Sequence, residues 1–393
     1  MLITKLVLEI FMSYEKLFQE IERLNEKYTN ILEDVCNIES PTNCKEGVDK
    51  VSYYFVEMAK KKGWKVEILK QEIAGDVVCI TLNPEANEKP ISLSAHLDTV
   101  HPIGLFGYPP VKRDNEKMYG PGVMDCKGGA VTAFMAMDAL EKVGFKKRPV
   151  MLLLQTDEEV GSGISNYETI NYICEKAKDS VGFINLEGSS GNTAVLQRKG
   201  IFRVNFTIKG KAAHSSKCFL GANAVLEAAH KIIELEKYKD GDNITCNCGV
   251  INGGTVANTV AEECSFTADF RYSTKENYEE IQKLIQKLCE NSAVDGCVCE
   301  YKVMNNRPAM QLCEKNEQFL KKMNEIYEKC GLPELKGRKA LGGSDAAYTT
   351  NAGIPTVDDL GTEGDRIHSI DEFIYLKSIA ESAKKIAAVC YGI

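Results

Sequence analysis

Short apolar runs recur along the first half of this chain, and two of them lead directly into a histidine or an acidic side chain. They are VVCITL (77–82), ISLSA (91–95), VMLLL (150–154) and VGFINL (181–186). Runs of this length, bounded by polar turns, are typical of strands buried on both faces of a parallel or mixed sheet. A segment that opens with two glycines, 127–142, has the composition of a helix between such strands. Alternating strands and helices predict a layered α/β domain with a mixed sheet.

The hydrophobic pattern changes near residue 199, where apolar and polar residues begin to alternate. The alternation in IFRVNFTIKG (201–210) fits an antiparallel strand with one face in water. Helices at 221–237 and 276–291 and strands near 244–250 and 263–271 are expected to follow. Together they make an α+β unit of about a hundred residues, which is a common domain size.

The alternation of helices and strands that is expected before residue 199 resumes after residue 308. Helices are expected at 314–330 and 374–390, with a strand-like segment at 354–357 between them. Helical apolar spacing also occurs at 14–36 and 46–62, near the start of the chain. The segment after residue 308 contains His368, so it must return to the first domain if it shares a site with His96. The sequence therefore predicts an insertion architecture, with these three stretches: body 1–198, inserted α+β domain 199–307, and body again 308–393.

The first twelve residues, MLITKLVLEIFM, are apolar but include Lys5 and Glu9. Twelve residues are too few to span a membrane, and no small-residue cleavage site follows them. We expect a helical turn packed on the body here, with Met12 as an alternative start to Met1. No other segment has the length and apolar composition of a membrane span.

Length, composition and charge indicate a globular protein and argue against one class of partner. A length of 393 residues fits two domains better than one core. Hydrophobic residues at 44% and charged residues at 26% describe an ordinary globular protein. A net charge of −8 leaves no basic surplus to neutralise phosphates, which argues against a nucleic-acid partner.

The chain contains 15 cysteines, scattered through predicted strands, helices and loops. Such a distribution, without a secretory signal, indicates reduced thiols and a cytoplasmic location. The pairs Cys246/Cys248 and Cys297/Cys299 have one-residue spacing instead of the CxxC spacing of zinc knuckles. Alternation along a strand explains these pairs as well as a structural zinc site does.

His96 and Asp98 stand two residues apart at the end of the run 91–95, in SAHLDTV. Residues two apart on a strand point to the same side. An imidazole beside a carboxylate suits a metal ligand and the group that fixes its tautomer. The alternative is a His–Asp pair at a surface strand end.

Further carboxylates follow later strands. Glu158 and Glu159 are adjacent in TDEEVGS, and Glu187 closes INLEG. Two adjacent ionised carboxylates repel each other, and holding both near a buried strand end requires a cation. One of the two can bind a metal ion while its neighbour transfers protons. The alternative is a solvated acidic turn. Asp125 lies in the glycine-rich turn GPGVMDCKGG and His368 in the polar loop RIHS, and neither is informative alone.

The joint pattern is more specific than its parts. In open α/β sheets, ligands bind beyond the carboxyl ends of the strands. Buried carboxylates there are costly unless a positive charge neutralises them. A mixed set of histidines and carboxylates suits two metal ions about 3.5–4 Å apart that share one carboxylate.

Five segments of the chain resemble the metal-site motifs of the co-catalytic zinc aminoacylase/carboxypeptidase family. They are SAHLDTV, YGPGVMDCKGG, QTDEEVGS, the strand end at Glu187, and GTEGDRIHS. That family includes glutamate carboxypeptidases, peptidase T, acetylornithine deacetylase and succinyl-diaminopimelate desuccinylase. The resemblance runs from about residue 30 to the C-terminus. It implies a catalytic α/β body and an inserted lid domain through which two chains form a homodimer.

The resemblance also implies a role for each motif residue. One zinc ion would be held by His96, Asp125 and Glu187, and a second by Asp125, Glu159 and His368, with Asp125 as the bridge. Asp98 would orient His96, and Glu158 would be the general base on the water held between the metals. Co²⁺ or Mn²⁺ could replace zinc in this ligand set. Cys126 follows Asp125, where members of the family often have an acidic residue. This difference could change the metal affinity, but it leaves the implied set of ligands complete.

Substrate-binding residues are implied in the same way. Asn258 in VANTV and Arg271 in DFR are similar to family segments that contact a substrate carboxylate. Arginine suits bidentate binding of a carboxylate, and an ion pair with Asp269 is the alternative. Arg307 in NNRPAM and Gly343 in LGGSDAAY resemble the glutamate carboxypeptidase branch.

His214 in KGKAAHSS matches a histidine that, in the family, donates to the oxyanion across a dimer interface; a solvated loop histidine is the alternative. The implied function is a dizinc exopeptidase that hydrolyses small peptides. An N-acyl amino-acid deacylase would use the same metal centre. A non-catalytic binding protein on this scaffold would be expected to lack ligands, and none is missing here.

Overall fold

The computed structural model describes the backbone of residues 2–393 and the side chains from Met12 onward. The chain forms two compact units and enters the second of them twice. Of the described residues, unit 1 contains 2–196, 312–339 and 344–393, and unit 2 contains 197–311 and 340–343.

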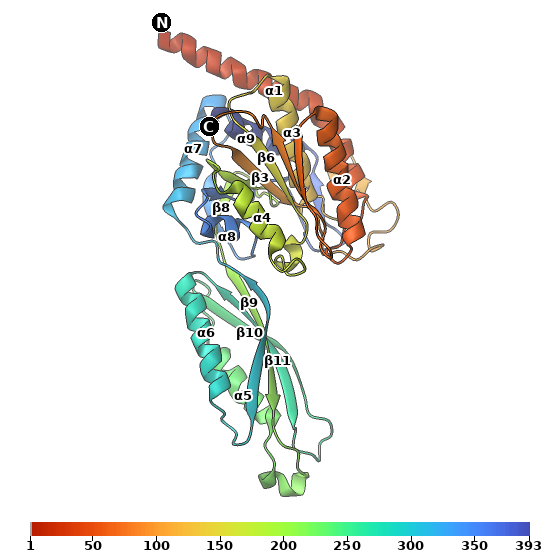
Figure 1. Ribbon diagram of the computed structural model, residues 1–393, viewed down its shortest axis with the longest axis vertical. Coiled ribbons are helices and arrows are strands. Elements are labelled where there is room, and N and C mark those ends of the chain that lie inside the picture. The colour runs from red at the N-terminus through yellow and green to blue at the C-terminus, as the bar shows by residue number, and fades with distance from the viewer. Residues whose placement is uncertain (1) are drawn as a thin grey trace. The chain divides into compact units, whose positions relative to one another are not determined.

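Unit 1 is built around a six-stranded sheet with the order β1-β2-β6-β3-β7-β14 (Figure 1). β6, β3, β7 and β14 are parallel to one another, whereas β1 and β2 pair antiparallel at one edge. The predicted layered α/β fold with a mixed sheet is confirmed. The strands are β1 (Lys65–Leu69), β2 (Val77–Leu82), β3 (Ile91–His96), β6 (Val150–Gln155), β7 (Phe183–Asn185) and β14 (Thr356–Val357).

Helices cover both faces of this sheet (Figure 1). Adjacent residues of a strand point to opposite faces, so Val78 and Ile80 of β2 join the larger core while Val77 and Cys79 join a smaller one. The larger core includes residues of α1, α2, α3, α7 and α9, and the smaller core includes residues of α4. The helices of unit 1 are α1 (Leu2–Cys36), α2 (Lys45–Lys62), α3 (Lys127–Lys142), α4 (Glu168–Ala177), α7 (Glu314–Cys330), α8 (Ala346–Asn351) and α9 (Lys377–Gly392).

The helices expected at 46–62, 127–142, 314–330 and 374–390 are present with small shifts of their ends, and the helix expected at 14–36 is part of the longer helix α1. Helix α1 extends back to Leu2. The expected packing of the first turn on the body concerns side chains that lie outside the described residues. Among the described residues, no helix is both long and apolar enough to cross a membrane.

A second sheet of unit 1 joins segments that are far apart in the sequence. Its order is β15-β16-β5-β4, and all its pairings are antiparallel. It brings the loop after β5, which contains Asp125, beside the loop between β15 and β16, which contains His368. The strands are β4 (Lys112–Arg113), β5 (Lys117–Tyr119), β15 (Gly364–Asp365) and β16 (Phe373–Tyr375), and a separate two-stranded sheet pairs β8 (Thr193–Arg198) with β13 (Lys336–Ala340).

Unit 2 is a four-stranded antiparallel sheet with the order β10-β11-β9-β12 and two helices. Every second residue of β9, from Phe202 to Ile208, joins the core of this unit, as the alternating sequence predicts. The elements are β9 (Gly200–Lys209), α5 (Ala224–Leu235), β10 (Ile244–Gly253), β11 (Glu263–Tyr272), α6 (Lys275–Glu290) and β12 (Val298–Arg307), with the short 3₁₀ helix η2 at Ser215–Leu220.

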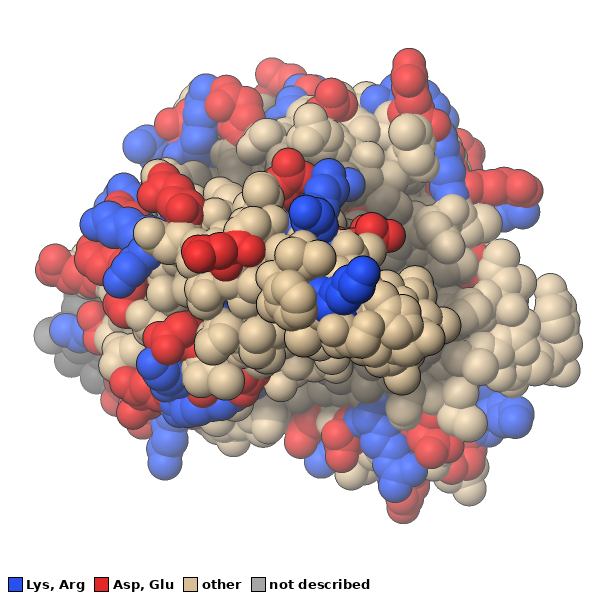
Figure 2. Space-filling view, turned by 90° about the horizontal axis from the view of Figure 1, so that it is seen from below, with Lys and Arg blue, Asp and Glu red and all other residues tan. Residues whose placement is uncertain are grey.

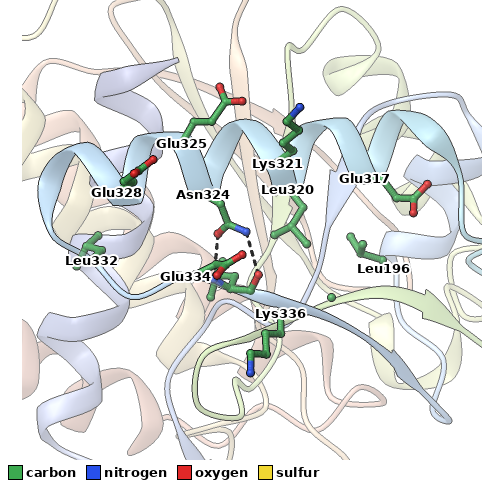
Figure 3. Close-up of a pocket in the computed structure, with 12 residues that line it drawn as sticks. Leu196, Glu317, Leu320, Lys321, Asn324, Glu325, Glu328, Leu332, Glu334 and Lys336 are labelled. Carbon is green, nitrogen blue, oxygen red and sulfur yellow. Dashed lines mark hydrogen bonds between the residues drawn. The ribbon is translucent and has the colours of Figure 1, made fainter.

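A cavity of about 920 Å³ lies in unit 1 between α7 and the segment 332–337 (Figure 3). Asn324 points from α7 toward this segment, where its amide donates to the Leu335 carbonyl and accepts from the Leu335 N–H, both at 2.9 Å. The apolar lining includes Leu196 and Leu320. None of the sequence-predicted site residues lines this cavity, so we assign it no part in the chemistry.

Charged side chains of both signs are interspersed around the face seen in Figure 2, and uncharged residues fill much of its centre. This face shows no continuous basic surface. The distribution agrees with a net charge of −8.

Candidate metal centre

The ends of β3 and β7 and the loop before α3 bring three predicted ligands together. His96 Nε2 lies 2.9 Å from Asp125 Oδ1 and 3.8 Å from Glu187 Oε2. β3 and β7 are parallel neighbours, with Ser94 opposite Asn185, so that His96 and Glu187 both emerge at the same sheet edge. The expected position beyond the carboxyl ends of the strands is therefore present.

The second carboxylate oxygen of Asp125 faces a different histidine. Asp125 Oδ2 lies 3.0 Å from His368 Nε2, and the same nitrogen lies 3.3 Å from Glu159 Oε2. Glu159 belongs to the 3₁₀ helix η1 (Glu158–Val160) that follows β6. All five predicted ligands thus form one cluster, with Asp125 in contact with both histidines.

Close backbone packing positions two of these ligands. A Cβ atom at Gly129, in the first turn of α3, would lie 2.1 Å from the Leu186 carbonyl oxygen, so only glycine fits there. The first turn of α3 can therefore approach the residue that precedes Glu187. Gly122 has a φ of +76°, which lets the loop turn before it reaches Asp125.

Asp98 is fully buried and connects the end of β3 to η1. Its Oδ1 accepts the Glu158 N–H at 3.1 Å, and its Oδ2 accepts the Glu159 N–H at 3.2 Å and the Thr42 hydroxyl at 2.8 Å. His96 Nδ1 lies 2.9 Å from the Asp98 main-chain oxygen and 3.4 Å from its carboxylate. The main-chain oxygen of Asp98 is therefore the nearer partner of the ring, because the carboxylate receives the η1 amides.

His368 adopts a strained backbone conformation. Its φ is +62°, in the left-handed region that residues other than glycine seldom occupy. Backbone outliers of this kind persist where the surrounding structure holds them, and they gather at functional sites. Half of the His368 side chain is exposed, which leaves this side of the cluster open to solvent.

Burial and mutual contact shift the acid–base properties of the cluster. Burial raises the pKa of Glu159 to about 7 and that of Glu187 well above its usual range. Burial also acts to raise the pKa of Asp125, but hydrogen bonds from His368 and His96 hold it below its usual value. Hydrogen bonds to Asp125 and Glu159 raise the pKa of His368 to about 10. The cluster therefore retains protons that a metal ion would displace.

The donor atoms fit divalent metal ions. Ligand atoms of His96, Asp125 and Glu159 lie within 4.8 Å of one another, and those of His96, Cys126 and Glu187 do so as well. Imidazole nitrogens and carboxylate oxygens are ligands that zinc accepts. The Cys126 thiol is fully buried and lies 3.1 Å from the His96 main-chain N–H, which donates to it.

His214 and Asn258 lie on neighbouring segments of unit 2. The Ser215 N–H donates to the Asn258 carbonyl at 2.8 Å, and both His214 and Asn258 are exposed. His214 Nδ1 accepts the Ser216 N–H at 3.2 Å. In the neutral ring this acceptor role leaves the proton on Nε2, which is then available as a donor.

The other predicted substrate-binding residues also lie in unit 2. Arg271 Nε donates to Asp269 Oδ1 at 2.8 Å, so the ion pair named as the alternative is formed. Arg307 is buried at the end of β12. A Cβ at Gly343 would lie 2.6 Å from Arg307 Cδ, which shows that the glycine lets this segment pack directly on Arg307.

The sequence model of peptidase family M20/M25/M40 matches residues 92–391. The chain belongs to this family. As a member of family M20/M25/M40 it is a metal-dependent hydrolase of peptide or acyl amino-acid bonds. The resemblance seen in the motifs is therefore confirmed.

Relatives of this M20/M25/M40 member extend over most of its length. It is 27% identical to carboxypeptidase G2 of Pseudomonas sp. (strain RS-16), over 86% of this chain and 82% of that protein. It is 25% identical to a probable succinyl-diaminopimelate desuccinylase of Staphylococcus aureus (strain MRSA252), over 92% of this chain and 96% of that protein.

Solved structures share the fold of this family member. A tripeptidase from Staphylococcus aureus superimposes with a TM-score of 0.77 at 21% identity, covering 93% of this chain and 98% of that one. An M20 family metallo-carboxypeptidase from Sulfolobus solfataricus gives a TM-score of 0.72 at 20% identity, again with 93% and 98% covered.

Residues outside the recognised motifs also contact the residues of this cluster or their neighbours. Thr42 contacts Asp98, and the buried carboxylate of Glu372 accepts from the Asp125 N–H at 3.1 Å. His101 lies 3.1 Å from Glu372. None of these three residues follows an apolar run that would have marked it in the sequence. His101 and Glu372 are 271 positions apart, so their contact could not be predicted from a single sequence.

Metal uptake by the protein should weaken as the pH falls. Metal binding requires neutral imidazole and ionised carboxylate, so it releases the protons that Glu159 and His368 hold in the metal-free cluster. Below the Glu159 pKa of about 7 one further proton must be displaced. We expect the apparent zinc affinity to fall about tenfold per pH unit for each displaced proton. Chelator competition at pH 6, 7 and 8 measures this, and an affinity independent of pH would contradict it.

Proposed function

We propose that this chain is a two-zinc exopeptidase that hydrolyses small peptides. The proposal rests on the contacts of Asp125: one carboxylate oxygen faces His96 and the other faces His368. Each of these histidines also lies near a glutamate. This is the contact pattern expected of a carboxylate that bridges two metal ions. His96, Asp125 and Glu187 would hold one ion, and Asp125, Glu159 and His368 the other.

Two zinc ions at this position would activate a water molecule and polarise the amide carbonyl of the substrate. Glu158 is the general base: its carboxylate accepts the proton of the attacking water and returns it to the leaving amine. The Asp98 carboxylate accepts the N–H groups of both Glu158 and Glu159. It therefore holds the backbone of the proposed base, Glu158, and of the proposed ligand, Glu159, in place. Co²⁺ or Mn²⁺ would occupy the same ligands.

His214 supplies the hydrogen bond to the oxyanion in this proposal. The acceptor role of Nδ1 toward the Ser216 N–H supports a ring that carries its proton on Nε2. A donor of this kind stabilises the negative charge that develops on the carbonyl oxygen. We assign the donor to the partner subunit of a homodimer formed through unit 2.

Exposed apolar side chains of unit 2 support the homodimer. Leu226 and Ile233 lie seven residues apart, on one face of α5, and both are exposed. Val250 and Ile251 are exposed on β10, which is an edge strand of the sheet. Apolar side chains exposed on an edge strand are typical of an interface with another chain.

The substrate carboxylate is assigned to unit 2 residues. Arg307 and the adjacent Gly343 present a guanidinium next to a glycine-rich segment whose N–H groups suit an anion. Asn258 lies beside the His214 segment, beyond the end of β9 at Lys209, whereas Arg307 pairs with Ile201 at the other end of β9. In this proposal Asn258 would therefore reach the substrate from the partner subunit, together with His214. Arg271 would contribute only after release from Asp269.

An N-acyl amino-acid deacylase is the second candidate for the same centre. The match with a probable succinyl-diaminopimelate desuccinylase over 92% of this chain favours it. We propose a cytoplasmic enzyme, because each of the 15 cysteines is a free thiol and reduced thiols are usual there. A small peptide or acyl amino acid is the proposed partner, with no nucleic acid or membrane.

Metal analysis combined with a substrate screen tests this function. The purified protein should contain about two zinc ions per chain, and chelation should abolish hydrolysis until zinc is restored. Dipeptides and tripeptides should be cleaved faster than N-acyl amino acids, whereas the reverse order would favour the deacylase. A metal-free preparation that retains full activity would contradict both candidates.

A further inference from the structure

Glu372 is a fully buried carboxylate that the register of the small sheet delivers to the metal-site loop. It directly precedes β16, in which Phe373 pairs with Tyr119 of β5. This pairing brings Glu372 next to Gly120, whose N–H donates to the Glu372 main-chain carbonyl at 3.2 Å. The Glu372 side chain therefore enters the loop between β5 and α3, which carries Asp125.

The Glu372 carboxylate accepts hydrogen bonds from several loop amides at once. Its Oε1 accepts the N–H groups of Met124 at 2.9 Å and Asp125 at 3.1 Å. Its Oε2 accepts the Gly122 N–H at 3.2 Å and lies 3.1 Å from Nε2 of His101, which can donate to it. Backbone N–H groups that converge on one acceptor in this way bind a negative charge well.

Glu372 also belongs to the loop that carries the opposite ligand. His368 lies four residues before it, in the connection between β15 and β16. The two ligands that Glu372 links, Asp125 and His368, lie 3.0 Å apart. The Glu372 carboxylate therefore connects the backbone of Asp125 to the loop that contains His368.

We propose that Glu372 is a positioning residue for the metal site formed by Asp125, His368 and Glu159, with His101 as its hydrogen-bond donor. The inference rests on the proposed two-metal centre. A glutamine at this position has a single acceptor oxygen, so some of the loop N–H groups would face its NH₂ group instead. The loop would then relax and Asp125 would move relative to His368.

The first test compares Glu372→Gln with Asp138→Asn, a control at a buried carboxylate in α3. Asp138 accepts from the Tyr28 hydroxyl at 2.8 Å and pairs with Lys62, and neither partner belongs to the metal centre. We expect Glu372→Gln to weaken one of the two zinc ions by about 10–100-fold, as is usual when the support of a ligand is lost. Asp138→Asn should lower the melting temperature but leave both zinc affinities unchanged.

The second test uses His101, which makes an edge-on contact with Phe106 at 4.9 Å between ring centroids. His101→Gln keeps a nitrogen donor near the position of Nε2, whereas His101→Phe keeps a planar ring and removes the donor. We expect His101→Gln to bind zinc like the wild type and His101→Phe to weaken the same ion as Glu372→Gln. This pair decides the question if Glu372→Gln does not fold.

Zinc affinities are measured by chelator competition, and cobalt spectra of the substituted protein report the ligand geometry. If the wild type binds two ions and both Glu372→Gln and His101→Phe bind them equally well, Glu372 has only a structural role and the inference is wrong. If the wild type binds no more ions than His368→Ala does, the two-metal proposal fails and this inference fails with it.

Discussion

Glu158→Gln should lower kcat by about 10²–10⁴-fold, the usual contribution of a general base. Glutamine cannot accept the proton of the attacking water, but it has nearly the same shape. The Glu158 N–H would still donate to Asp98, so η1 and the proposed ligand Glu159 should stay in position. The metal content should therefore remain near that of the wild type.

Steady-state kinetics and elemental analysis of the same preparation check this expectation. Glu168→Gln is a suitable control, because Glu168 is exposed at the start of α4 and contacts Gln71. It should leave both kcat and the metal content unchanged. If Glu158→Gln loses metal together with activity, Glu158 is a ligand and the proposed division of roles between Glu158 and Glu159 is wrong.

His214→Ala should lower kcat by about 10²–10³-fold, the typical effect of removing one oxyanion donor. If the donor comes from the partner subunit, mixing His214→Ala chains with Glu158→Gln chains should restore activity. In an equal mixture, random pairing gives about one quarter of the sites an intact Glu158 and an intact His214. Activity should therefore rise to about a quarter of the wild-type value.

Each variant mixed with itself provides the control and should stay inactive. Subunit exchange is verified with differently tagged chains. Exchange without recovery would mean that His214 acts within its own chain or takes no part in the reaction. A monomer by analytical ultracentrifugation would contradict the proposed homodimer itself.

The main elements of the fold were predictable because burial leaves a simple pattern in the sequence. β2, β3 and β6 are buried along their whole length, and each appears as an uninterrupted apolar run. β12 was not predicted, because most of its residues are exposed and it lacks an alternating pattern. The two- and three-residue strands β4, β5, β15 and β16 are too short to leave a pattern at all.

The proposed metal site was predictable to the extent that its residues stand at strand ends. His96, Glu159 and Glu187 follow buried strands closely, whereas Asp125 and His368 needed the family resemblance. The supporting residues His101 and Glu372 could not be found, since their contact depends on the pairing of β5 with β16. The sequence also suggested that the Asp98 carboxylate orients His96, although its main-chain oxygen is the nearer partner.

The left-handed backbone at His368 limits how this enzyme can change over evolution. A φ of +62° disfavours β-branched and bulky residues, whereas asparagine and aspartate tolerate it best after glycine. Both replacements offer an oxygen atom in place of the imidazole nitrogen. Oxygen ligands favour harder ions such as manganese and magnesium. Position 368 is therefore where we expect descendants of this scaffold to shift their metal preference with the least disturbance of the backbone.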